Sequence, residues 1–208
     1  MGIRAYDEMN ALQRDIMKEI GSIGTGNAAT ALSSLLAKTI KMTVPDVKIM
    51  GYNEAVAAIG TPEEIISGVL VHMTGDINGI MLYIQRMEFI NLVLKQFGLP
   101  QISDYTQLEH IQISAIKEIS NIIISSYVNA LTKLMDMSVS LSVPSISVNM
   151  LGAIVTVPMA ELGYQTDKAM MIDGTFICEG EEVSSKLLMM PNMDSLNNLL
   201  EKLGNYYE

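Results

Sequence analysis

The chain has 208 residues and a formal net charge of −10 at pH 7, and hydrophobic residues make up 49% of it. Its length suits one large domain or two small ones, and with only 17% charged residues the composition excludes extended disorder. An acidic chain without a basic cluster repels phosphates, so we expect it to bind neither nucleic acid nor an anionic membrane surface.

The chain begins without the pattern of a targeting segment. Residues 1–8 do not place an apolar run after basic residues, as a signal peptide would, and no later apolar run reaches the ~20 residues of a membrane span. Cys178 is the only cysteine, so no internal disulfide can form and a reducing compartment is expected. We therefore predict a cytoplasmic protein without membrane insertion.

The first predicted helix begins near Leu12. Its core-facing residues recur at helical spacing and are Leu12, Ile16, Ile20 and Ile23. Small residues follow over residues 21–31, which favours the close approach of another backbone. A strand is predicted over residues 40–44, because apolar and polar residues alternate there before Pro45.

A hairpin and a helix complete the first half of the chain. Residues 68–72 and 79–84 flank two glycine-containing turn signals, which is typical of paired antiparallel strands. A helix is predicted over residues 87–97, with Gly98 as its C-terminal cap. Residues 99–106 are the predicted connection to the second half.

The second half repeats the first at an offset of 99 residues. Laying residues 13–47 over residues 112–146 gives ten identical pairs in 35 positions. The identical pairs are Gln13/Gln112, Lys18/Lys117, Glu19/Glu118, Ile20/Ile119, Ile23/Ile122, Ala31/Ala130, Leu32/Leu131, Leu35/Leu134, Val44/Val143 and Pro45/Pro144. We interpret this as a duplication within a single domain of residues 1–208, with repeats over about residues 9–99 and 107–205.

The second repeat predicts the same kinds of element. Its long helix follows from a stripe of four isoleucines at helical spacing, Ile116, Ile119, Ile123 and Ile124. Strands are predicted over residues 139–143, before Pro144, and over residues 186–190, and a helix over residues 193–203 is stopped by Gly204. Because each repeat has few strands, we expect one continuous β-sheet shared by both repeats and covered by helices.

Polar residues on the two long helices form a repeated constellation. Ser114, Glu118 and Asn121 stand at i, i+4 and i+7, so they project from one stripe, away from the isoleucines. The corresponding residues of the first repeat are Asp15, Glu19 and Ser22. Glu118 and Asn121 alone would be interpreted as solvated helix residues, but their recurrence in a duplicated frame favours a functional site.

This constellation resembles the CheC/CheX/FliY family of chemotaxis phosphatases. The likeness is carried by residues 18–31, KEIGSIGTGNAATA, and residues 118–122, EISNI, and it extends over nearly the whole chain, including the repeat. The resemblance implies an α/β (α+β) fold with pseudo-twofold symmetry. It also implies hydrolysis of the aspartyl phosphate of phospho-CheY-type response regulators.

The roles that the resemblance implies for Glu118 and Asn121 agree with the chemistry of the reaction. A response regulator already holds Mg²⁺ and a lysine beside its aspartyl phosphate, so this chain needs no metal ion of its own. What is missing is a water placed in line with the leaving carboxylate, and the amide of Asn121 can hold it. The carboxylate of Glu118 can bind a cationic group of the regulator and fix the helix in register.

The first repeat departs from this pattern at Ser22. A serine has a shorter reach than an asparagine and no amide, so we expect this site to bind through Glu19 and to catalyse weakly. Asn27 points about 80° away from Glu19 by helical geometry and is not a substitute for Asn121. Two roles are expected for Ser114 and Asp15: each either contacts the partner or stays solvated.

The resemblance also allows two other functions. A binding adaptor is the alternative function, in which the chain senses phospho-CheY and regulates a CheD-type receptor deamidase through residues 148–162, where Pro158 is expected to limit the length of any helix. A structural part of the flagellar switch is less favoured, because no additional domain is visible.

His72 and His110 lack acidic or cysteine neighbours at ligand spacing, so we expect them in packing or at the surface.

Overall fold

The two repeats begin with helices of equal length. The computed structural model describes residues 10–43, 46–162 and 168–205, and in it α1 (Ala11–Leu36) opens the first repeat and α4 (His110–Met135) the second. Two short strands and a helix follow in each repeat: β1 (Ile40–Met42), β2 (Asp46–Gly51) and α2 (Tyr52–Ile59), then β5 (Val139–Leu141), β6 (Ser145–Met150) and α5 (Leu151–Glu161). Every boundary from the start of α1 to the start of α2 recurs 99 residues later, which is the offset of the sequence repeat.

Each repeat ends with a hairpin and a helix. These elements are β3 (Ile65–Gly75), β4 (Gly79–Gln85) and α3 (Met87–Gln96), and then β7 (Lys168–Cys178), β8 (Glu181–Pro191) and α6 (Met193–Asn205). A 3-10 turn, η2 (Tyr105–Gln107), lies in the connection between the repeats. Gly98 takes a left-handed conformation, with φ +67°, just after α3, as its predicted capping role requires.

The eight strands form one antiparallel sheet, as predicted. The order is β1-β7-β8-β4-β3-β5, with β2 also paired to β7 and β6 also paired to β3. The hairpin β3–β4 of the first repeat therefore meets the hairpin β7–β8 of the second along the seam between β4 and β8. The short strands of each repeat extend the hairpin of the other repeat, so the sheet is interleaved.

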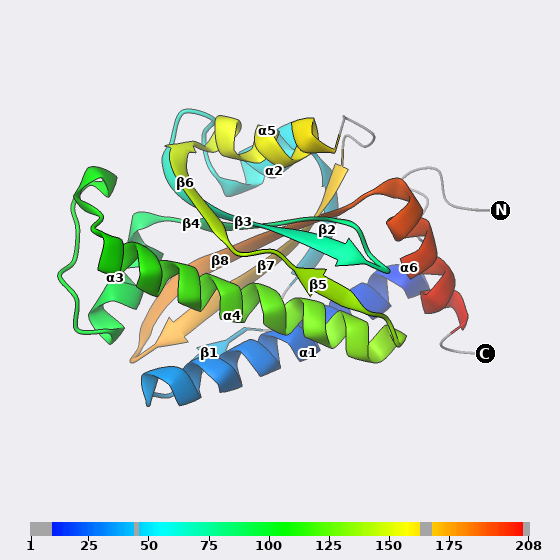
Figure 1. The fold of residues 1–208 in the computed structure, drawn as a ribbon, viewed down its shortest axis with the longest axis horizontal. Coiled ribbons are helices and arrows are strands. Elements are labelled where there is room, and N and C mark those ends of the chain that lie inside the picture. The colour runs from blue at the N-terminus through cyan, green and yellow to red at the C-terminus, as the bar shows by residue number, and fades with distance from the viewer. Residues whose placement is uncertain (1–9, 44–45, 163–167, 206–208) are drawn as a thin grey trace.

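Helices cover both faces of the sheet (Figure 1). Side chains of the central strands alternate between the two layers. Val69, Val71 and Tyr83 belong to the core beneath α1 and α4, whereas Ile66 and Leu82 belong to the core beneath α2 and α5. The predicted α/β (α+β) class, with one sheet between helices, is confirmed.

The helices α1 and α4 pack against each other in opposite directions (Figure 1). A side chain added at Gly24 would lie 2.6 Å from a ring carbon and 2.9 Å from the Cα of Tyr127, so only glycine allows this approach. Burial raises the pKa of Tyr127, whose hydroxyl forms a 2.8 Å hydrogen bond with the hydroxyl of Thr25. The close approach predicted from the small residues of the first repeat is thus confirmed at Gly24.

Some details of the predicted helices are wrong. Leu12 and Ile23 are 48% and 38% exposed, because α1 turns its small residues toward α4 and leaves one apolar flank at the surface. Pro158 does not end α5, which continues to Glu161. Likewise α6 includes Gly204 and ends at Asn205, since a glycine weakens a helix without forbidding it.

The predicted short strands are shorter than expected. β1 and β5 cover three residues each of the five predicted, and Pro45 lies outside the described residues. Among the described helices, none is long and apolar enough to cross a membrane. His72 is at the surface, where its Nε2 lies 2.7 Å from a carboxylate oxygen of Glu161.

Candidate functional site

Both long helices start with the same cap. The side chain of Gln13 accepts from the backbone N–H of Asn10 at 2.9 Å, and the side chain of Gln112 accepts from the backbone N–H of Glu109 at 2.8 Å. These bonds satisfy backbone groups that a helix start leaves without partners. They explain why Gln13 and Gln112 are identical in the two repeats, and they set the position at which each helix begins.

The polar residues predicted on α4 lie on its outer face. We call Ser114, Glu118 and Asn121 the second ridge. Ser114 and Glu118 are exposed and Asn121 is partly exposed, while Ile116, Ile119 and Ile123 on the opposite side are fully buried. The isoleucines therefore fix the rotation of α4 that turns Glu118 and Asn121 outward, one helical turn apart.

Glu118 and Asn121 of the second ridge are available to a partner. Within the described parts of the chain, Glu118 and Asn121 make no hydrogen bond or ion pair. The hydroxyl of Ser114, by contrast, donates to the carbonyl of His110 at 2.9 Å. A carboxylate and an amide at the surface can each receive a group from another molecule without first breaking a bond within the protein.

The corresponding residues of α1 form the first ridge, which consists of Asp15, Glu19 and Ser22. Asp15 and Glu19 are exposed and Ser22 is partly exposed. The hydroxyl of Ser22 donates to the carbonyl of Lys18 at 2.9 Å, so it is turned back onto its own helix. The first ridge therefore has an exposed carboxylate at the position that corresponds to Glu118, and its serine hydroxyl is engaged with the backbone.

The two ridges lie near opposite ends of the helix pair. Each occupies the N-terminal half of its helix, and α1 and α4 run in opposite directions side by side (Figure 1). The geometry thus offers two separate surfaces of similar shape and different chemistry.

The polar stripe on α4 is longer than the predicted one, which ends at Asn121. Ser125 is partly exposed and Asn129 is exposed, and they continue the stripe one and two turns beyond Asn121. The same helical count that selected Ser114 would have found both residues. The first repeat has Gly26 and Thr30 at these positions, so the two stripes also differ there.

Potential metal ligands are scattered. In residues 10–43, 46–162 and 168–205, no three His, Cys, Asp or Glu side chains come together in a way that could hold a metal ion. Cys178 is buried and free, and burial raises the pKa of its thiol.

Comparison with known proteins identifies the family. A model of the CheC-like family matches the chain twice, at residues 12–49 and 111–148, which are the two copies of the long helix and the strands after it. The CheY-P phosphatase CheC of Bacillus subtilis is 30% identical over 200 residues, which cover 92% of this chain and 94% of that protein. The chain belongs to the CheC-like family.

More distant relatives share the fold. The flagellar motor switch phosphatase FliY of B. subtilis is 24% identical over 144 residues, 69% of this chain and 38% of that protein. The crystal structure of FliY from Thermotoga maritima superimposes with a TM-score of 0.72 at 20% identity, covering 96% of this chain and 99% of that one. A chain in the crystal structure of the FliG–FliM complex from H. pylori has a TM-score of 0.70 at 11% identity, covering 92% and 100%. CheC-like architecture is therefore common to proteins with divergent sequences.

Proposed function

We propose that this chain hydrolyses the aspartyl phosphate of a phosphorylated CheY-type response regulator, with the second ridge entering the regulator's phosphorylation site. The name of the B. subtilis relative, a CheY-P phosphatase, supports the reaction. The observation that carries the mechanism is the pairing of Glu118 and Asn121, one turn apart on the exposed side of α4 and without partners in the described residues.

Asn121 is assigned to the attacking water. Its side-chain oxygen accepts a hydrogen bond and its NH₂ group donates, so one amide can orient a water toward phosphorus. Phosphoryl transfer proceeds through a loose transition state, in which positioning contributes more than a strong base. An amide is therefore sufficient for this step, provided that it is held in the right place.

Glu118 is assigned to docking. The carboxylate can bind the cationic lysine that a response regulator carries beside its phosphorylated aspartate. The Mg²⁺ needed to neutralise the phosphoryl group belongs to the regulator, so the chain contributes no cofactor of its own. Ser114 would lie at the edge of this contact, one turn before Glu118.

The first ridge is assigned to binding with weak catalysis. Glu19 offers the same docking group as Glu118, and Asp15 lies beside it. The hydroxyl of Ser22 is occupied by the carbonyl of Lys18 and cannot replace an amide over the same distance. One chain would then hold two regulator molecules and dephosphorylate mainly the one on α4.

The decisive test measures decay of the regulator's acyl phosphate. Asn121→Ala should slow the catalysed decay about a hundredfold, because the water loses its orienting group. Asn53→Ala is the matched control, since Asn53 is an exposed asparagine on α2, on the opposite side of the sheet. Equal rates for Asn121→Ala and the wild type would refute the assignment.

A second test separates docking from turnover. Glu118→Gln keeps the shape of the side chain and removes its charge, so we expect KM for the phosphorylated regulator to rise about tenfold while kcat changes little. Glu63→Gln removes the same charge from an exposed site just before β3 and serves as the charge control. A similar rise in KM for both variants would point to net charge instead of a specific contact.

A CheD-binding adaptor is the second candidate function. Its predicted surface, residues 148–162, contains α5 and the end of β6, and Val148, Met150 and Val157 are exposed there by 38%, 48% and 45%. Val157 lines a surface pocket with Ser147 and Asn149, whereas Val148, between them on β6, faces the other side of the sheet. Val157 is therefore the exposed apolar side chain on the α5 side that favours a protein partner. Val157→Glu should abolish binding of a CheD-type protein and leave regulator dephosphorylation unchanged, and retained binding would remove this role.

A further inference from the structure

A chain of buried polar side chains lies directly beneath the second ridge. The side-chain NH₂ of Gln85, at the end of β4, donates to the hydroxyl of Ser120 on α4 at 2.6 Å. The Ser120 hydroxyl in turn donates to the carbonyl of Ile116 at 2.6 Å, and the hydroxyl of Ser67 on β3 donates to the oxygen of the Gln85 amide at 3.4 Å. All three polar side chains are fully buried.

The Gln85–Ser120 hydrogen bond joins the end of β4 to one position along α4. Ser120 lies between Glu118 and Asn121 in sequence and points to the opposite side of the helix. Apolar contacts tolerate small rotations of a helix, but a buried hydrogen bond depends on direction and has no water to replace it. A rotation of about 10° would shift the Ser120 hydroxyl away from its partner and move the Asn121 amide by about 1 Å, because the amide lies ~6 Å from the helix axis.

The first ridge lacks this support. Gly21 takes the place of Ser120, and β8 ends at Pro191 where β4 ends at Gln85, two residues before the next helix in both repeats. Neither Gly21 nor Pro191 has a side-chain hydrogen-bonding group. The buried hydroxyl of Thr25 on α1 bonds to Tyr127 of α4, 2.8 Å away, so it joins the two helices to each other and not α1 to the sheet.

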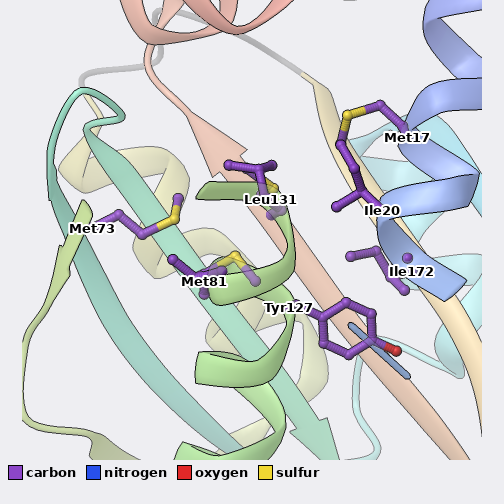
Figure 2. Close-up of a pocket in the computed structure, with 10 residues that line it drawn as sticks. Met17, Ile20, Met73, Met81, Tyr127, Leu131 and Ile172 are labelled. Atoms are coloured by element: carbon purple, nitrogen blue, oxygen red, sulfur yellow. The ribbon is translucent and has the colours of Figure 1, made fainter. Parts of the chain in front are cut away.

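A small cavity lies against Gly21, and apolar side chains from both long helices and from the sheet line it. Figure 2 shows Met17 and Ile20 of α1 opposite Tyr127 and Leu131 of α4 around this space. The cavity is small, with a volume of about 10 Å³, and methionines from the two central hairpins also line it. Methionine side chains adapt easily, so this wall holds a helix less rigidly than a directed hydrogen bond does.

We infer that Gln85 and Ser120 are positioning residues, which fix the rotation of α4 so that Asn121 holds its water in line. This inference rests on the proposed phosphatase function. It adds a second difference between the ridges to the Ser22/Asn121 exchange, namely the way each ridge is anchored to the sheet. Neither positioning residue touches the regulator, since both side chains are fully buried.

The test compares kcat with KM for variants of the pair. Ser120→Ala should lower kcat for regulator dephosphorylation about tenfold and leave KM within about twofold, because the docking carboxylate stays exposed while the amide loses its fixed position. The same variant leaves a buried amide without an acceptor, so its melting temperature should fall by roughly 3–6 °C.

The double variant Gln85→Leu/Ser120→Ala separates positioning from stability. Replacing both partners by apolar groups removes the unsatisfied amide, so the melting temperature should recover most of the loss, although the Ser67 hydroxyl gives up its 3.4 Å acceptor. We expect kcat to remain low, because the directed contact is still absent. Recovery of kcat together with the melting temperature would overturn the inference.

A matched control uses another buried hydrogen bond in the same core. Ser185→Ala removes the partner of the Tyr83 hydroxyl, 3.1 Å away, which joins two strands and no helix. This variant should lose stability and keep its kcat, so an equal loss of kcat would also overturn the inference.

The outcomes distinguish this inference from the proposed function. If Asn121→Ala leaves the decay rate unchanged, the phosphatase assignment itself fails. If Asn121→Ala slows decay while Ser120→Ala and the double variant keep the wild-type kcat, only the positioning role fails. Should Ser120→Ala not fold, the double variant alone decides.

Discussion

The two long helices resemble each other more in backbone than in the side chains next to their ridges. Each has 26 residues and the same glutamine cap, and Ala37 and Asp136 end them in the same left-handed conformation, with φ of 51° and 48°. Both expose a carboxylate at the same point along the helix. The repeats differ where it matters for chemistry, at Gly21 and Ser22 in α1 against Ser120 and Asn121 in α4.

The position of each helix and the chemistry of its ridge are specified by different residues. Caps and core side chains set where a helix begins and which face it buries. In the mechanism that we propose, two consecutive residues then decide whether that frame carries a water-orienting amide and whether the sheet holds it in place. A duplicated scaffold can therefore keep its shape while one of its two sites loses or gains turnover.

The largest expected effect comes from making the second ridge like the first. Asn121→Ser should lower regulator dephosphorylation about a hundredfold, because a hydroxyl cannot span the reach of an amide and can bond to the carbonyl of Lys117, as Ser22 does to Lys18. Steady-state decay of the acyl phosphate measures this. Activity within twofold of the wild type would show that the Ser22/Asn121 exchange does not distinguish the sites.

An intermediate effect is expected at the contact between the helices. Gly24→Ala should lower the free energy of unfolding by about 1–2 kcal/mol, because its new methyl group would press on the backbone of Tyr127. Gly26→Ala, two residues later on the open side of α1, should instead raise it by roughly 0.5–1 kcal/mol. Urea denaturation of both variants provides the measurement, and stabilisation by Gly24→Ala would show that the approach is not limiting.

The smallest effect is expected from repairing the first ridge. Ser22→Asn restores an amide beside Glu19, but Gly21 beneath it still lacks the anchor that Ser120 provides in α4. We expect total turnover to rise by less than about twofold, with regulator affinity unchanged. A rise to twice the wild-type kcat would indicate that the amide alone makes a complete site.

Much of the fold follows from local patterns. The repeat, the alternation of apolar residues in the strands and the isoleucines of α4 predicted the long helices, the hairpin of the first repeat and the outward direction of Glu118 and Asn121, but not the hairpin β7–β8 of the second repeat. These features depend on residues within a turn or a strand of each other, where periodicity decides which side is buried.

What the patterns did not reveal depends on contacts between distant residues. Leu12 and Ile23 look like core residues, yet α1 is buried on the side that meets α4 at Gly24, which no property of α1 alone specifies. Gln85 and Ser120 are 35 positions apart and belong to a strand and a helix, so their bond has no local signature. The caps formed by Gln13 and Gln112 could have been predicted, because each glutamine lies three residues after the residue that precedes its helix.

The interleaved sheet makes the two repeats dependent on each other. β1 and β2 lie on β7, and β5 and β6 lie on β3, so a fragment containing one repeat would have no partner for its short strands. Cleaving the backbone between Gly98 and Asp104 should therefore leave two pieces that are insoluble apart and reassemble when expressed together. Such complementing fragments would allow one ridge to be altered or labelled while the other half of the protein remains untouched.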